Sequence, residues 1–140
     1  MLTRHAIVCA QGFEPLARLR HLRILDVCGA QRLTDEHVEA IAAANAALEE
    51  LNCTWCVQLT DAAVRALAAG CAGLRWLSLH GIRGISGGAL DALERGPGGP
   101  QLVALDVNGC AGIPAERRSK ESLRALLPLL EQTVIHTQFS

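Results

Sequence analysis

The sequence has very few aromatic residues and little charge. Only 3% of its 140 residues are Phe, Trp or Tyr, tyrosine is absent, and 19% are charged. Thirteen basic and fourteen acidic residues give a net charge of -1, so the chain lacks the basic excess that attracts nucleic acid or an anionic membrane surface. We therefore expect no nucleic-acid or membrane partner. A surface so poor in charge is consistent with partial cover by a protein partner.

Long hydrophobic runs are also lacking. The longest uncharged run of note, 40–48, is far shorter than the roughly 20 apolar residues of a membrane-spanning helix. The apolar patch at the N-terminus is too short for a secretory signal, so the six cysteines are expected to be reduced thiols. The cytoplasm or the nucleus is the predicted location, and mitochondrial import is the alternative left open by the arginines near the N-terminus.

A repeat organises the middle of the chain. Leu22, Leu48 and Leu74 are spaced by 26 residues, and Leu102 follows 28 residues later. Each unit begins with the apolar period of two that is typical of a strand and continues with the three-to-four spacing of a helix. We therefore expect parallel strands near 24–28, 50–54, 76–80 and 104–108. The expected helices cover 35–45, 61–70, 87–95 and 119–131, and Pro128 should bend the last one or end it early.

Several residues in these units resemble the cysteine-containing leucine-rich repeats of the F-box/leucine-rich-repeat proteins. Cys56 and Cys110 lie eight residues after the leading leucine, Leu-Thr-Asp marks the turns at 33–35 and 59–61, and the stretch 48–61 is especially close. The resemblance implies an α/β fold, a short right-handed leucine-rich-repeat solenoid with parallel strands on the concave side and helices on the convex side. It places the repeats at 22–113, between an irregular N-terminal capping repeat, 1–21, and a C-terminal capping helix and terminal strand, 114–140.

The same resemblance implies a role in binding proteins. F-box members hold their substrates on the repeats, whereas the 21 residues that precede the first clear unit here do not read as an F-box. We therefore expect a protein-protein interaction module that binds its partner on the concave strand face, as an adaptor or substrate receptor does. The alternative is a structural subunit embedded in a large multiprotein assembly. The partner's identity is not in the sequence.

The expected contact residues are those that point out of the strands between the core leucines. Tryptophan among polar side chains is the usual composition of a protein-binding hot spot, and the acidic residues nearby favour a partner segment that carries Lys or Arg. Strand alternation predicts that Trp76 is exposed, whereas Trp55, at the strand exit, fits burial and exposure equally well. The predicted partner-binding residues are Asp26, Glu50, Asn52, Trp55, Trp76, Ser78, His80, Asp106 and Asn108.

Two patterns raise the question of chemistry. Cys53 and Cys56 have the CxxC spacing of a zinc or dithiol site, but no second CxxC completes a zinc set and both positions coincide with core positions of the repeat. Ser78, His80 and Asp106 can be drawn as a Ser-His-Asp arrangement, but no glycine-rich oxyanion loop or nucleophile elbow accompanies them. We therefore expect no enzymatic activity, no catalytic residue, no metal site and no cofactor.

Overall fold

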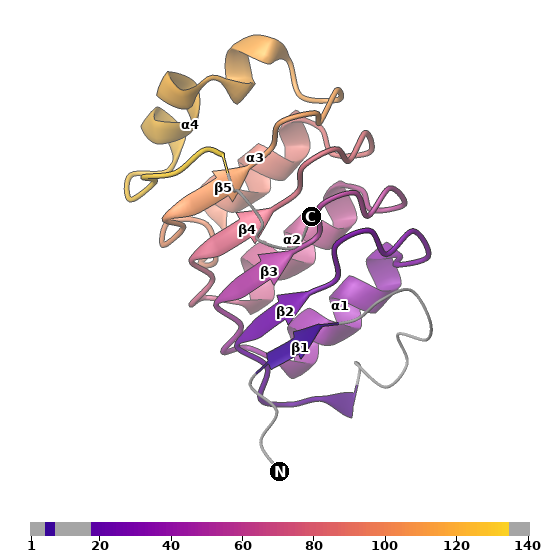
Figure 1. Cartoon of the computed structure of the whole chain (residues 1–140). Coiled ribbons are helices and arrows are strands. Elements are labelled where there is room, and N and C mark those ends of the chain that lie inside the picture. Colours follow the sequence, from indigo (N-terminus) through magenta and orange to yellow (C-terminus); the bar gives the residue numbers. More distant parts are fainter. Residues whose placement is uncertain (1–4, 8–17, 135–140) are drawn as a thin grey trace.

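A computed structural model describes residues 5–7 and 18–134, which form a small α/β domain around one sheet (Figure 1). The four predicted strands lie where the repeat places them and run parallel, with the central leucine of each strand in register with the next. A further strand pairs in parallel at the edge, so the sheet has five strands in chain order. The strands are β1 (His5–Ile7), β2 (Ile24–Asp26), β3 (Glu50–Asn52), β4 (Trp76–Ser78) and β5 (Ala104–Asp106).

Three helices of similar length cover one face of the sheet and lie side by side (Figure 1). These are α1 (Asp35–Ala44), α2 (Asp61–Gly70) and α3 (Gly87–Arg95), within one residue of the predicted bounds. After β5 the chain forms a 3-10 helix, η2 (Ala115–Arg118), and then α4 (Lys120–Leu126). The last helix ends before Pro128, as expected for a residue without an amide hydrogen. No helix among the described residues has both the length and the apolar character needed to cross a bilayer.

The predicted fold class, a short right-handed leucine-rich-repeat solenoid, is corrected to a small α/β domain with one parallel sheet and four α-helices. Within the described residues, only β2, β3 and β4 are each followed by a long helix; Pro114 ends the regular spacing after β5. The segment after α4 then returns to the edge of β5, where the amides of Glu131 and Gln132 donate to the carbonyl of Val103 at 2.8 and 3.0 Å. Most of the expected N-terminal capping repeat, 1–21, and the last six residues of the expected C-terminal cap, 114–140, lie outside the described residues.

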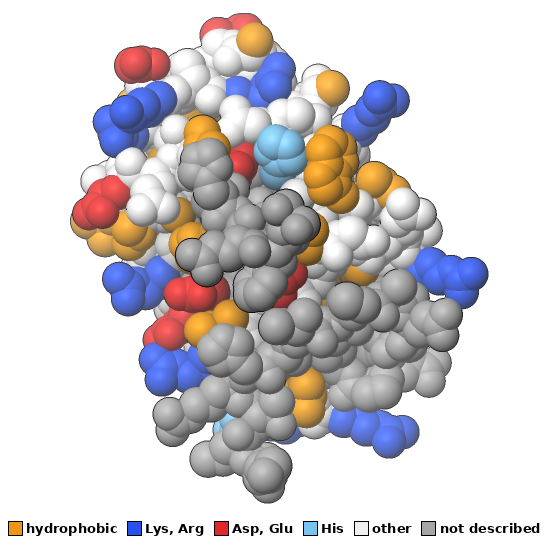
Figure 2. Space-filling view, in the orientation of Figure 1, with side chains coloured by type: hydrophobic (Ala, Val, Ile, Leu, Met, Phe, Trp, Pro, Cys, Tyr) orange, Lys and Arg blue, Asp and Glu red, His pale blue; other side chains and the backbone are white. Residues whose placement is uncertain are grey.

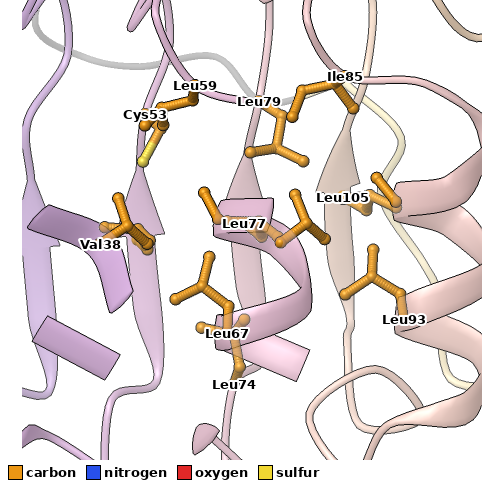
Figure 3. Close-up of a cluster of buried hydrophobic side chains, with 14 of the residues drawn as sticks. Val38, Cys53, Leu59, Leu67, Leu74, Leu77, Leu79, Ile85, Leu93 and Leu105 are labelled. Carbon is orange, nitrogen blue, oxygen red and sulfur yellow. The ribbon is translucent and has the colours of Figure 1, made fainter. Parts of the chain in front are cut away.

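The hydrophobic core lies between the sheet and the helices (Figure 3). The leading and central leucines of each unit are at most 2% exposed, because their side chains fill the same layer in every unit. Cys53, Cys56 and Cys110 are fully buried in this layer, which confirms their predicted core position. The thiols of Cys56 and Cys110 also donate to the carbonyls of Val27 and Leu79 at 3.1 and 3.0 Å. These two cysteines therefore join the second unit to the strand end of the first, and the fourth unit to the strand end of the third.

Hydroxyl side chains cap two of the helix starts. The hydroxyls of Thr60 and Ser86 accept from amides of the first helical turn, as N-cap residues do. At Thr34 the helix start is a capping box with His37, in which the backbone amide of Thr34 donates to Nδ1 of His37 at 3.0 Å. The carboxylate of Asp35 accepts from both the amide and the hydroxyl of Thr60, at 2.8 and 2.6 Å. The caps therefore also bind one strand–helix unit to the next.

Candidate binding surface

The chain leaves four strands through residues with the same unusual backbone conformation. Gly29, Gly81 and Gly109 have φ angles of 76°, 79° and 78°, and Trp55 occupies the equivalent place with a φ of 62°. A left-handed conformation costs a residue with a side chain about 1–2 kcal/mol, and among the described residues Trp55 is the one non-glycine that adopts it. We call the four loops that begin at these residues, 29–34, 55–60, 81–86 and 109–114, the exit edge.

Trp55 is held in one orientation at this edge while much of its ring stays in contact with solvent. The residue is 53% exposed, which settles the open question of its burial in favour of exposure. Its ring meets the imidazole of His80 edge to face, with centroids 5.3 Å apart, and its amide donates to the carbonyl of His80 at 2.9 Å. A Cβ atom on Gly81 would lie 2.4 Å from the ring, so the indole rests directly on that glycine.

The space-filling view shows hydrophobic surface beside a histidine on the strand side of the molecule (Figure 2). Besides Trp55, the large apolar side chains exposed among the described residues are Val57, Leu129 and Val134. Val57 is 50% exposed and lies in the same loop as Trp55. Trp55 and Val57 are therefore the two large apolar side chains that the exit edge exposes, and we call them the apolar pair.

A polar row runs across the sheet next to the exits, and most of it is buried. The strand register places Asp26, Asn52, Ser78 and Asp106 side by side, but the last three are only 4%, 0% and 1% exposed. The expectation that these three face a partner from an open surface is therefore wrong. The amide of Asn52 donates to the carboxylate of Asp26 at 3.3 Å, and the hydroxyl of Thr54 lies 2.7 Å from both Asn52 Oδ1 and Ser78 Oγ.

The row also closes the ends of the strands. In three units the side-chain oxygen of the row accepts a hydrogen bond from the backbone amide two residues further on, as Asx turns do. The bonds run from Cys28 to Asp26 at 3.0 Å, from Thr54 to Asn52 at 3.1 Å and from Asn108 to Asp106 at 2.9 Å. These polar side chains are thus bound to the backbone that turns the chain toward the exit edge.

The remaining predicted contact residues are accessible to different extents. Glu50 is exposed, and Trp76, its neighbour in the strand register, is partly buried. The His80 side chain is 37% exposed, and its Nδ1 lies 3.4 Å from the buried carboxylate of Asp106. Asn108 is exposed, although its amide group donates to the carbonyl of Thr133 at 3.1 Å. The accessible or partly accessible members of the predicted set therefore lie on β2, β3 and β4 and at or directly before the exit edge.

The Ser-His-Asp arrangement considered from the sequence, Ser78, His80 and Asp106, does not form a catalytic triad. Ser78 is fully buried, and its hydroxyl is bonded to Thr54. Among the described residues no hydrogen bond joins Ser78 to His80, which a serine nucleophile and its base would share. A hydroxyl that cannot reach solvent or a base has no route to attack a substrate.

The CxxC pair is a buried pair of thiols. Within the described part of the chain, Cys53 and Cys56 are free and no group of three or more His, Cys, Asp or Glu is placed to hold a metal ion. The hydrogen bond between the two thiols raises the pKa of Cys53, and burial adds to the effect. The same bond lowers the pKa of Cys56. Neither sulfur is exposed, so solvent and large reagents do not reach the pair in the folded protein.

Two arginines of the exit edge and Val57 were missed by sequence reasoning. Arg32 and Arg83 are exposed and lie in the loops on either side of the loop that holds Trp55. The sequence does hold a signal for this surface. When the units are aligned on their leading leucines, the seventh following residue is glycine in three units and Trp55 in the other, so the position that departs from the pattern is the one to examine.

Comparison with known proteins finds a similar fold. No family model matches the chain. A solved structure titled "Leiomodin-1 Actin-Binding Site 2 (ABS2)" matches 84% of this chain and 68% of its own, with a TM-score of 0.53 and 21% sequence identity. That structure is named as an actin-binding site and not as a leucine-rich-repeat protein, which overturns the predicted fold class. At this identity the likeness shows the fold alone: a small α/β domain with a parallel sheet.

Proposed function

We propose that this chain is a protein-binding domain whose contact surface centres on Trp55 and extends to Glu50 and Trp76 on the strand face. One observation carries the proposal. Trp55 keeps a large ring half exposed in a backbone conformation that the three other exits give to glycine. Strained residues of this kind are characteristic of binding sites, and tryptophan is enriched among the residues that dominate protein-protein binding energy.

The form of binding that we propose is that of an adaptor or substrate receptor, which holds a partner without changing it. The proposal assigns no catalytic step and no cofactor to the chain, and it places the protein in the cytoplasm or nucleus. The name of the similar structure supports a protein as the class of partner. Actin is the first defined candidate, tested by co-sedimentation of the full chain with actin filaments.

The decisive experiment uses Trp55→Gly, which installs the residue found at the other three exits. Full-length wild type, Trp55→Gly, Trp76→Ala and Arg65→Ala are immobilised, and the proteins captured from native extract are quantified by mass spectrometry. Arg65 is exposed on α2, on the helix side, so its variant is the control. We expect a partner that wild type and Arg65→Ala retain equally, that Trp76→Ala retains less well, and that Trp55→Gly loses by about tenfold or more. Equal capture by Trp55→Gly and wild type would refute the proposed surface.

A structural subunit of a large assembly is the second candidate. Leu129 and Val134, which are 56% and 52% exposed, lie in the chain that follows α4 rather than at the exit edge, and a permanent neighbour would cover them. Size-exclusion chromatography with light scattering separates the two candidates. A domain that binds its partner reversibly stays monomeric alone, whereas an obligate subunit aggregates or co-purifies with its neighbour in fixed proportion.

A further inference from the structure

We infer that the partner segment bound at the exit edge carries an apolar side chain flanked by acidic residues. This inference rests on the proposed function and names the partner's chemistry. The apolar side chain would contact the exposed pair Trp55 and Val57. The acidic residues would contact Arg32 and Arg83, which lie on either side of that pair.

Contacts between neighbouring loops place the two arginines around the apolar pair. The side chain of Gln58 donates to the carbonyl of Gln31 at 2.7 Å, which holds the loop of Arg32 against the loop of Trp55. On the other side, a Cβ on Gly84 would lie 2.5 Å from the carbonyl oxygen of Leu59. The residue next to Arg83 therefore packs closely against the same central loop.

The exit edge is positive, because its four loops contain two arginines and no acidic residue. Both guanidinium groups belong to exposed residues, and neither forms an ion pair with another described residue. Complementary charge of this kind guides a partner to its place and fixes its orientation.

Two carboxylates directly after these loops are engaged in hydrogen bonds at the helix starts. Asp35 accepts both hydrogen bonds from Thr60, and Asp61 accepts from the amide of Ser86 at 2.7 Å and from its hydroxyl. Asp106, which the sequence analysis counted toward an acidic contact surface, is 1% exposed. These three carboxylates therefore serve the fold, and for the segment bound at the exit edge the basic partner expected from the sequence is replaced by an acidic one.

Two defined peptide pools test this inference. Each consists of fluorescein-labelled 12-residue peptides with a central Leu or Phe, and their charged positions are Asp or Glu in one pool and Lys or Arg in the other. Binding to the full chain is measured by fluorescence anisotropy at two salt concentrations. We expect the acidic pool to bind about fivefold or more tightly than the basic pool, and the difference to shrink at high salt because exposed charges are screened. Tighter or equal binding of the basic pool, or no binding of either, would overturn the inference.

Charge-neutral variants locate the effect. The double variant Arg32→Gln plus Arg83→Gln should weaken binding of the acidic pool by about fivefold. Arg65→Gln, the same change on the helix side, should leave the binding unchanged. An equal loss of affinity in the double variant and in Arg65→Gln would show a general charge effect and contradict the proposed site. These experiments also distinguish failure of the proposed binding surface from failure of the acidic partner chemistry. If a captured protein partner depends on Trp55 but not on the two arginines, the acidic chemistry is wrong and the binding surface stands.

Discussion

The four strand exits share a positive φ angle but reach it with two kinds of residue. Three leave the sheet through glycine, which takes positive φ without a steric penalty, and one leaves through Trp55 in the same conformation. Beneath them the units are alike: the same layer of buried leucines and the same parallel register continue from β2 to β5. The repeated core therefore accounts for stability in every unit. It does not account for Trp55, which stands where the other exits have glycine.

The first test of this comparison adds a side chain at Gly81, the exit next to Trp55. Gly81→Ala combines a residue unsuited to positive φ with a Cβ 2.4 Å from the Trp55 ring. We expect a loss of about 2 kcal/mol or more in the free energy of unfolding, measured by denaturant titration. The change should displace the indole and alter the tryptophan fluorescence. In the Trp55→Gly background the same substitution should cost less, and an equal cost in both backgrounds would show that the ring does not rest on Gly81.

The same change at Gly29 sharpens the comparison, because no atom of the described residues, chain neighbours aside, lies within 4 Å of a Cβ built there. Gly29→Ala therefore measures the backbone cost alone, which we expect to be about 1–2 kcal/mol. Differential scanning calorimetry of Gly29→Ala beside wild type provides the value. A stabilised variant would mean that positive φ carries no penalty at these exits, and the argument from Trp55 would lose its basis.

The far end of the Trp55 loop provides a third test. The hydroxyl of Thr60 accepts from the amide of Ala62 at 3.3 Å and donates to Asp35 at 2.6 Å. Thr60→Ala should lower the free energy of unfolding by about 1 kcal/mol, measured by thermal denaturation. Thr34→Ala should cost less, because the backbone amide of Thr34 donates to His37 and this bond does not need the hydroxyl. A larger loss at Thr34 would reverse the assignment of the caps.

A further test, whose effect is confined to alkaline pH, compares the cysteines of two exit loops. Burial raises the pKa of Cys110 to about 11, whereas the bond from Cys53 lowers the pKa of the equivalent Cys56. Below an ordinary thiol pKa of 9.0, Cys110 is protonated in both the folded and the unfolded chain. Between 9.0 and about 11 the unfolded chain loses this proton and the folded chain keeps it, so stability should fall as the pH rises. Denaturant titrations from pH 8 to 11 should show a shallower fall for Cys110→Ala, and an unchanged slope would contradict the assignment.

Much of the fold was predictable because its pattern is repeated. The leucine period located the central strands and the first three helices, since burial of the same positions in every unit leaves the same spacing in the sequence. The C-terminal end was harder. Pro114 and the charged residues after it replace a regular helix start with the 3-10 helix η2, and the broken period gives no register. The class name drawn from the resemblance was also wrong, because a shared local spacing does not decide the complete architecture.

The candidate site was less predictable, because side-chain hydrogen bonds decide which polar residues are accessible. Strand alternation placed Asn52, Ser78 and Asp106 on the strand face, but it could not show that they are buried and bonded to strand ends and to one another. Trp55 was located beside that face, but its exposure depends on a backbone angle that alternation does not contain. Local conformation, not periodicity, therefore determined the surface.

The most direct test of the account is the equilibrium stability of Trp55→Gly. Our central claim is that Trp55 is kept for contact with a partner and not for the fold. If so, relief of the left-handed strain should largely offset the lost contacts with Gly81 and His80, and the free energy of unfolding should stay within about 1 kcal/mol of wild type. A loss of about 3 kcal/mol or more, on the scale of a truncated core side chain, would show that Trp55 serves the fold and would contradict the claim.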